Sequence, residues 1–307
     1  MKKFTGVISL VTFIVLSLWI LGLLFTDRWA WSQWLSWIPT LPLLMLILIT
    51  ASSAIFEKTK MKATVFCFIF VFVFCWYLFI ENRFNATGRN GALRIVGWTM
   101  SYSKQKVSKE SAEEVIRLNG DITLLTHGWI VRGEPIIKEW LGEGKRRVSG
   151  PFTLLTRLPV LEVNVLVASD GIYISMFRID TSEQLGKPLV LWAIDLPSNI
   201  TIPKIETARR VRRLLSSIEV PRPDIIIGDF NMTRDSFSIV TMFPEFIDAS
   251  NLAGTGLLAS FPMQIPLYHI DHSLVGDSFV CDSYVLINPH IGRHRVQIVE
   301  MSAQKND

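Results

Sequence analysis

Cysteine is scarce in this chain of 307 residues, which has three. Cys67 and Cys75 fall inside an apolar stretch, where cysteine acts as a small hydrophobic residue, and only Cys281 lies in the later, more polar part. The part after residue 90 therefore has no disulfide of its own. This excludes a disulfide-stapled scaffold, but not an oxidising compartment, which permits disulfides without requiring them.

The sequence also lacks a strong charge of either sign, internal repeats and low-complexity segments. Its formal net charge is only +4, and the one local basic run predicts a solvated helix face: Arg209, Arg210, Arg212 and Arg213. A protein that binds nucleic acid needs many basic residues on one surface to contact the phosphates. No such groove is evident, so nuclease activity is the least favoured function.

Long hydrophobic runs are abundant, and most of them lie before Glu81. Residues 7–26, 38–56 and 63–80 each have about the length that a helix needs to cross a bilayer. No small-residue cleavage signature follows the first run, so it predicts an uncleaved anchor and not a signal peptide. Residues 1–90 are therefore predicted to form a membrane anchor of three transmembrane helices.

The basic residues that flank these runs predict their orientation. Five lysines precede the first run or fill the loop between the second and third: Lys2, Lys3, Lys58, Lys60 and Lys62. The loop between the first two runs has only Arg28, together with four tryptophans typical of a membrane–water interface. The positive-inside rule puts the lysines in the cytoplasm. Three crossings then put everything after Glu81 outside it.

Residues 91–303 alternate between short β-rich runs and helical segments. Strands are predicted over residues 93–98, 121–126, 152–158, 163–168, 172–179, 189–196, 224–230, 270–275, 279–287 and 295–301, and helices over 108–118 and 202–218. Hairpin signals such as Ser169-Asp170-Gly171 mix with longer crossovers. We therefore expect two packed sheets with helices outside, a layered α/β sandwich.

Polar residues near the ends of these strands are the candidates for chemistry. Asp229 and Asn231 are two apart at the end of an apolar strand, so their side chains point to the same side. A carboxylate there can take a proton from water and a carboxamide can donate to an oxyanion, although both are also ordinary turn residues. Asp271 lies inside a strand-like run and needs a partner if buried. His294 is the candidate partner, with a structural or surface role as the alternative.

Taken in order, these pieces resemble the endonuclease/exonuclease/phosphatase superfamily, whose members include DNase I-like nucleases, sphingomyelinases and inositol phosphatases. The motifs are a strand ending in Trp98, Gly-Asp-Phe-Asn at 228–231, Ile-Asp-His-x-Leu-Val at 270–275 and Arg-His-Arg at 293–295. The resemblance covers about residues 93–301 and implies a four-layer α/β sandwich. Bacterial relatives with N-terminal membrane helices make the bacterial inner membrane the expected location.

The resemblance implies a role for each matching position. Asp229 would orient or deprotonate the attacking water, and Asn231 would hold the scissile phosphate. Asp271 and His294 would form the pair that stabilises charge on the phosphoryl oxygens. All four agree with the family pattern in residue type.

Four positions depart from that pattern. Thr99 replaces an asparagine, His127 a metal-binding glutamate, Asp195 a histidine and Arg293 an aspartate. Magnesium prefers carboxylate and carbonyl oxygens, so these exchanges predict a degenerate magnesium site. Magnesium or manganese is the expectation from the family, and zinc or no metal is the expectation from His127 and Arg293.

Substrate and metal ligands follow from the same comparison. Arg293, Asn231 and Thr99 are predicted to bind the phosphate, since a guanidinium can grip it through two hydrogen bonds. His127 and Asp229 are predicted to bind a metal.

The favoured function is a membrane-anchored phosphoester hydrolase acting outside the cytoplasm on a phosphate-containing small molecule or lipid headgroup. The alternative is a catalytically degenerate domain that binds anions or a protein partner. A third, weaker hypothesis is a lipid-directed phosphodiesterase, because tethering keeps the domain near the bilayer.

Overall fold

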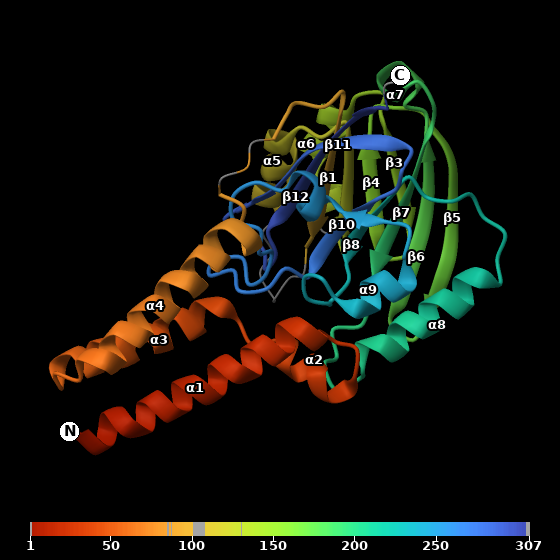
Figure 1. Cartoon of the computed structure of the whole chain (residues 1–307). Helices are drawn as coiled ribbons and strands as arrows, with labels where there is room; N and C mark the ends of the chain where they lie inside the picture. Colours follow the sequence, from red (N-terminus) through yellow and green to blue (C-terminus); the bar gives the residue numbers. More distant parts are fainter. Residues whose placement is uncertain (1, 85, 87, 101–107, 130, 305–307) are drawn as a thin grey trace.

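The computed structural model describes residues 2–84, 86, 88–100, 108–129 and 131–304. A helical region at the N-terminus projects from an α/β sandwich that contains the rest of the chain (Figure 1). The helices of the first region are α1 (Lys2–Phe25), α2 (Ala30–Ser36), α3 (Thr40–Phe56) and α4 (Lys60–Trp76), which continues into a π-helical turn, η1 (Tyr77–Glu81).

Two of these helices are long and apolar enough to cross a membrane, over Thr5–Phe25 and Lys60–Glu81. The predicted span over 38–56 corresponds to α3, which has 17 residues and is bent by 65° from α2. Pro39 lies at this break as the residue before the first turn of α3. A third crossing stays a prediction.

Helix α3 packs between α1 and α4 and joins them through apolar and polar contacts. Its buried face includes Leu43, Ile47 and Ala51. The hydroxyls of Thr12 on α1 and Thr50 on α3 lie 2.6 Å apart, which satisfies both groups without water. Large apolar side chains on the opposite faces of these helices are exposed.

The sandwich consists of two six-stranded sheets. The first has the order β11 (Phe279–Ile287), β12 (Val296–Ala303), β1 (Leu93–Thr99), β2 (Ile122–Thr126), β4 (Phe152–Thr156) and β3 (Lys145–Ser149). The second has the order β5 (Val160–Ser169), β6 (Ile172–Ile179), β7 (Leu189–Asp195), β8 (Ile225–Asp229), β10 (Asp271–Val275) and β9 (Ile247–Asp248).

The helices of the sandwich are α5 (Ser108–Leu118), α6 (Pro135–Leu141), α7 (Ser182–Leu185), α8 (Lys204–Ser216), α9 (Phe237–Met242) and α10 (Ala249–Ala253), with a short 3-10 turn, η2 (Val131–Gly133). Residues alternate between the two faces of each strand. Ile95 therefore packs between the sheets, whereas its neighbour Val96 packs against α5 and α6. Helices α8 and α9 cover the outer face of the second sheet. The predicted sandwich of two sheets with outer helices is confirmed.

Strand direction brings the candidate residues to one end of the sandwich. β1 and β2 are parallel, as are β7 and β8, so the carboxyl ends of each pair lie together. β10 runs antiparallel to β8 and places Asp271 opposite Asp229. β12 runs antiparallel to β1, so His294, just before it, returns to the same end.

The helical region is fastened to this same end. The carboxylate of Asp27 accepts hydrogen bonds from the hydroxyl of Ser236 (2.5 Å) and the backbone N–H of Ser238 (3.2 Å). The ring of Trp37 lies 5.0 Å from that of Tyr268. In Figure 1, α2 accordingly lies beneath the sandwich beside α8 and α9.

Candidate active site

The turn after β8 fixes Asp229 and Asn231 through backbone geometry. Gly228 has φ +153°, and a Cβ there would lie 1.9 Å from the carbonyl oxygen of Ile194, so only glycine fits. Asn231 has φ +51°, a left-handed conformation that asparagine tolerates. Its backbone N–H donates to Asp229 Oδ1 (3.0 Å) and its side-chain amide donates to the carbonyl of Leu196 (2.8 Å). One amide hydrogen of Asn231 remains for a ligand.

Asp271 and His294 form a buried pair. Asp271 Oδ2 lies 2.8 Å from His294 Nδ1, and its Oδ1 accepts a 2.7 Å bond from the hydroxyl of Thr99. Burial alone would raise the pKa of Asp271, but the imidazolium of His294 and these hydrogen bonds outweigh it and lower that pKa. Burial likewise would lower the pKa of His294, and the Asp271 carboxylate raises it to about 9. At neutral pH the pair is therefore ionised.

Asp229 joins this pair in a compact cluster. One ligand atom from each of Asp229, Asp271 and His294 lies within 4.8 Å of the other two. Burial and repulsion from the Asp271 carboxylate raise the pKa of Asp229 well above its ordinary value. A carboxyl group of raised pKa beside a charged imidazole is typical of catalytic sites.

A second pair, His127 and Asp195, joins the two sheets beside this cluster. His127 follows β2, Asp195 ends β7, and His127 Nε2 lies 3.0 Å from Asp195 Oδ2. Asp195 is the register partner of Asp229 on the neighbouring strand. Thus the two positions at which the sequence resemblance leads us to expect a glutamate and a histidine carry a histidine and an aspartate in mutual contact.

The other predicted ligands have different surroundings. Thr99 is buried and bonded to Asp271, which makes it a support for that carboxylate. Arg293 is exposed, and its guanidinium lies 5.6 Å from the ring centroid of Phe261. The same ring packs 4.9 Å from the imidazole of His294, so Arg293 lies at the rim of the cluster. Its binding of phosphate stays a prediction.

Two residues near the cluster have no signal in the sequence. Lys204 opens α8, is almost fully buried and donates from Nζ to the carbonyl of Pro197 (2.7 Å). Burial lowers its pKa to about 8, although the charge of Asp229 opposes that shift. The hydroxyl of Ser260 accepts the backbone N–H of Asp271 (3.2 Å). Neither residue lies in a recognisable motif, so only the fold reveals them.

The donor set indicates which cation these residues could hold. The carboxylates of Asp229 and Asp271 with the imidazole of His294 suit zinc, which accepts nitrogen as well as oxygen ligands, and zinc would bind the imidazole in its neutral form. Both oxygens of Asp271 already bond Thr99 and His294, and His127 bonds Asp195 and lies outside this group. Few oxygens remain for octahedral magnesium. The role of His127 as a metal ligand stays a prediction.

Several solved structures share the fold of the sandwich. No protein-family model and no curated protein matches the sequence. The mannosyl-6-phosphatase Bt3783 of Bacteroides thetaiotaomicron is 15% identical with a TM-score of 0.53, and the match covers 68% of this chain and 99% of that one.

Two further structures are endonuclease/exonuclease/phosphatase family proteins. The one from Bacteroides thetaiotaomicron is 16% identical with a TM-score of 0.54, covering 71% of this chain and 97% of its own. The one from Leptotrichia buccalis is 10% identical with a TM-score of 0.51, covering 68% and 99%. The sandwich of this chain has the fold of the endonuclease/exonuclease/phosphatase, or DNase I-like, superfamily.

Proposed function

We propose that the protein is a membrane-anchored phosphoester hydrolase that acts outside the cytoplasm. The observation that supports it best is the meeting of Asp229, Asp271 and His294 within 4.8 Å at the end of the sandwich, on a fold shared with a phosphatase. These residues are far apart in the sequence and belong to both sheets. A structural role alone does not require two carboxylates and an imidazole in one buried cluster.

Asp229 is the base that takes a proton from water in this proposal. A carboxylate with a raised pKa is a stronger proton acceptor than an ordinary one, and efficiency is greatest when that pKa approaches the working pH. As the oxygen of water bonds to phosphorus, its proton passes to Asp229. The reaction therefore needs Asp229 ionised at its start.

His294 is the acid that completes the reaction. Its Nδ1 is bonded to Asp271, which leaves the Nε2 proton for the departing oxygen as the phosphorus–oxygen bond breaks. Asp271 keeps the imidazole charged until then. One proton is gained by Asp229 and one is lost by His294, so exchange with solvent restores both groups.

The phosphate is held by positive charge and by hydrogen-bond donors. The amide of Asn231 and the ammonium of Lys204 lie on the Asp229 side, and Arg293 lies at the rim. A divalent cation held by the carboxylates of Asp229 and Asp271 would add positive charge against the phosphoryl oxygens while His294 keeps its proton.

A degenerate anion-binding module is the second candidate. The observation in its favour is the contact of His127 with Asp195. The resemblance predicts a metal-binding glutamate at position 127, but the residue there is a histidine that already bonds Asp195. In that case the cluster would bind phosphate without turnover.

Turnover by the full-length protein in detergent distinguishes the two candidates. Phosphomonoesters and phosphodiesters are assayed with magnesium, manganese, zinc or EDTA. Asp229→Asn is compared with Asp277→Asn, at an exposed aspartate that follows β10 at the end of the strand opposite to Asp271. Hydrolysis lost only in Asp229→Asn supports the enzyme. A folded protein that binds phosphate but hydrolyses none of the esters would contradict the hydrolase and support the binding module.

Membrane anchoring and an external location belong to the same proposal. Its support is the length and apolarity of the two helical segments, their exposed apolar faces and the lysines of residues 58–62. A bilayer would cover those faces, and the positive-inside rule sets their direction.

A further inference from the structure

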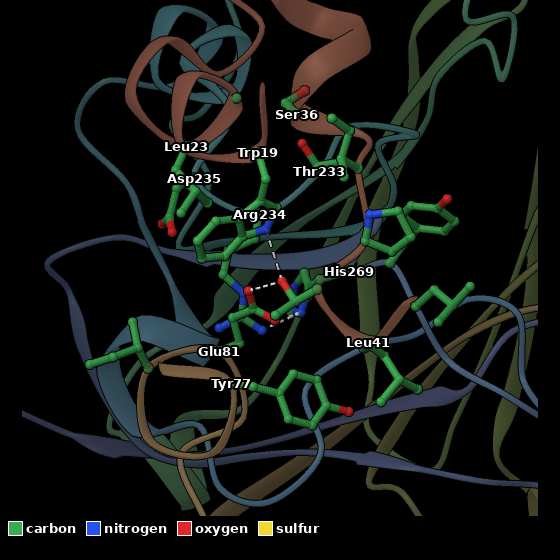
Figure 2. Close-up of a pocket in the computed structure, with 18 of the residues that line it drawn as sticks. Trp19, Leu23, Ser36, Leu41, Tyr77, Glu81, Thr233, Arg234, Asp235 and His269 are labelled. Carbon is green, nitrogen blue, oxygen red and sulfur yellow. Dashed lines mark hydrogen bonds between the residues drawn. The ribbon is translucent and has the colours of Figure 1, made fainter. Parts of the chain in front are cut away.

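A cavity of about 240 Å³ lies between the helical region and the sandwich. Figure 2 shows Trp19, Leu23, Leu41 and Tyr77 from the helices on its wall, together with Arg234 and His269 from the sandwich. Most of the exposed wall is apolar. The residues that α1, α3 and α4 contribute to the wall come from the end of each helix nearest the sandwich, and α2 and η1 supply the other helical residues. The cavity therefore lies where the proposed spans leave the bilayer.

The cavity lies next to the catalytic cluster along three separate segments of chain. Arg234 follows Asn231 by three residues, His269 precedes Asp271 by two, and Ala259 precedes Ser260, whose hydroxyl accepts the N–H of Asp271. Three residues of extended chain span at most about 10 Å. Therefore the backbones of Arg234 and His269 in the wall each lie within about 10 Å of a residue of the candidate site, Asn231 and Asp271 respectively.

The end of the cavity toward the sandwich is polar. The hydroxyl of Thr40 donates to Glu81 Oε1 (2.5 Å) and accepts from Trp19 Nε1 (3.2 Å), both drawn in Figure 2. Arg234 Nη2 donates to the carbonyl of Leu258 (2.9 Å), but its Nη1 is buried and has no partner among the described residues. A buried guanidinium N–H without an acceptor is costly and suits an anionic oxygen.

We propose that this cavity binds a hydrocarbon chain of a membrane lipid whose phosphate group is the substrate of the cluster. The proposal rests on the proposed function and specifies its substrate class. A lipid in the outer half of the bilayer would place its chain between α1 and α4, beside Trp19 and Leu23, and its charged group toward Arg234. The volume suits part of one chain, since it is below the 300–1,000 Å³ or so typical of sites that enclose a whole ligand.

Filling the cavity tests this in the full-length protein reconstituted into phospholipid nanodiscs. Leu23→Trp places a large ring in the wall, whereas Leu24→Trp adds the same ring one residue later, at a side chain that is 69% exposed and outside the wall. The measured quantity is the ratio of kcat/KM for a long-chain phospholipid phosphoester to that for a short-chain, water-soluble one. We expect Leu23→Trp to lower the ratio at least fivefold and Leu24→Trp to leave it unchanged. An unchanged ratio in Leu23→Trp overturns the proposal.

A binding measurement separates this proposal from the proposed function. A phospholipid with a photoreactive group at the end of its chain is cross-linked in the nanodiscs, and the attachment sites are mapped by mass spectrometry. Cross-links to the cavity wall that disappear in Leu23→Trp support the lipid site, even from a protein without turnover. Cross-links confined to the outer faces of α1 and α4, or hydrolysis of water-soluble esters alone, contradict it.

Discussion

The side-chain oxygen of Gln33 accepts a 2.6 Å hydrogen bond from the backbone N–H of Lys204. The amide nitrogen of the same Gln33 donates to the carbonyl of Ile200 (2.7 Å). Gln33 belongs to α2, between the first two apolar helices, and Lys204 opens α8 near the cluster of Asp229, Asp271 and His294. One side chain thus connects the helical region to the segment that carries Lys204, so this contact helps to fix the orientation of the sandwich relative to the helical region.

We expect Gln33→Ala to destabilise this connection. It leaves the buried N–H of Lys204 without its partner, which costs about 1–3 kcal/mol. The carbonyl of Ile200 also loses its partner, but Ile200 is exposed, so water can replace that bond. Thermal unfolding of the full-length protein in detergent should show a lower Tm. Gln264→Ala, at an exposed position, should leave the Tm unchanged, and equal Tm values for both variants would contradict the connection.

The dependence of kcat/KM on pH should be bell-shaped. The rising limb reports ionisation of Asp229, whose pKa is raised by burial and by Asp271, and the falling limb reports loss of the proton of His294 near pH 9. Loss of an acid or base costs about 10²–10⁴-fold in rate. His294→Asn should therefore lower the rate by that factor and remove the falling limb. A falling limb that persists in this variant assigns it to another group, with Lys204 the nearest alternative.

The sequence predicted the strands that carry the site because burial leaves a clear pattern there. β8 is a continuous apolar run that ends in Asp229, and β10 is a short run in which Asp271 is conspicuous. β3 was not predicted because its sequence, Lys-Arg-Arg-Val-Ser, has no apolar pattern. It forms the edge of the first sheet, where charged side chains face solvent and pairing comes from the neighbouring strand.

The site was predictable only in part for a similar physical reason. The link between Asp271 and His294 follows from the need of a buried carboxylate for a partner, and the structure places them 2.8 Å apart. The position of Lys204 beside the cluster depends on the path of the chain between β7 and α8. The contact of His127 with Asp195 depends on how the two sheets pack against each other. Such relationships are tertiary and leave no local pattern in the chain.

Stability should fall as pH rises toward 9. The pKa of His294 is raised from 6.5 to about 9 in the folded protein, so its stabilisation is complete below pH 6.5 and is lost as pH rises through about 9. The shift corresponds to about 3 kcal/mol. The raised pKa of Asp229 also makes stability fall as pH rises. The lowered pKa of Asp271 has the opposite effect, because its stabilisation is complete above the ordinary pKa of an aspartate and is lost only at lower pH.

Denaturant unfolding of His294→Asn across pH 6 to 10 measures that contribution. The variant should lose most of the dependence of the free energy of unfolding on pH between about 6.5 and 8. Above about pH 8 the lowered pKa of Lys204 adds a dependence of opposite sign, which both proteins keep. The control is His290→Asn, at an exposed histidine whose left-handed backbone (φ +57°) asparagine tolerates. This variant should keep the pH dependence of the wild type. An equal pH dependence in His294→Asn and the wild type would show that the pair does not stabilise the fold.

The orientation of the helices is testable by cysteine labelling in intact cells. In a background with the three native cysteines replaced by serine, Asp277→Cys in the sandwich should react with a membrane-impermeant maleimide. Lys60→Cys, at the first residue of α4 within the lysine-rich segment 58–62, should react only after the cells are opened, because the positive-inside rule places it in the cytoplasm. The reverse pattern would place the catalytic cluster inside the cell.

Exchanging the two members of the His127–Asp195 pair should alter the response to magnesium. The double variant His127→Glu, Asp195→His keeps a carboxylate and an imidazole in contact across the two sheets, but moves the carboxylate to the residue that follows β2 in the first sheet. An oxygen ligand in that place suits a hard cation better than an imidazole does. We expect magnesium to raise the Tm of the double variant, and its phosphoesterase rate at least tenfold, with little effect on the wild type. Since a bound ligand stabilises by RT ln(1 + [L]/Kd), the rise in Tm should grow with magnesium concentration, and a rise of equal size in the wild type would show that its own site already accepts magnesium.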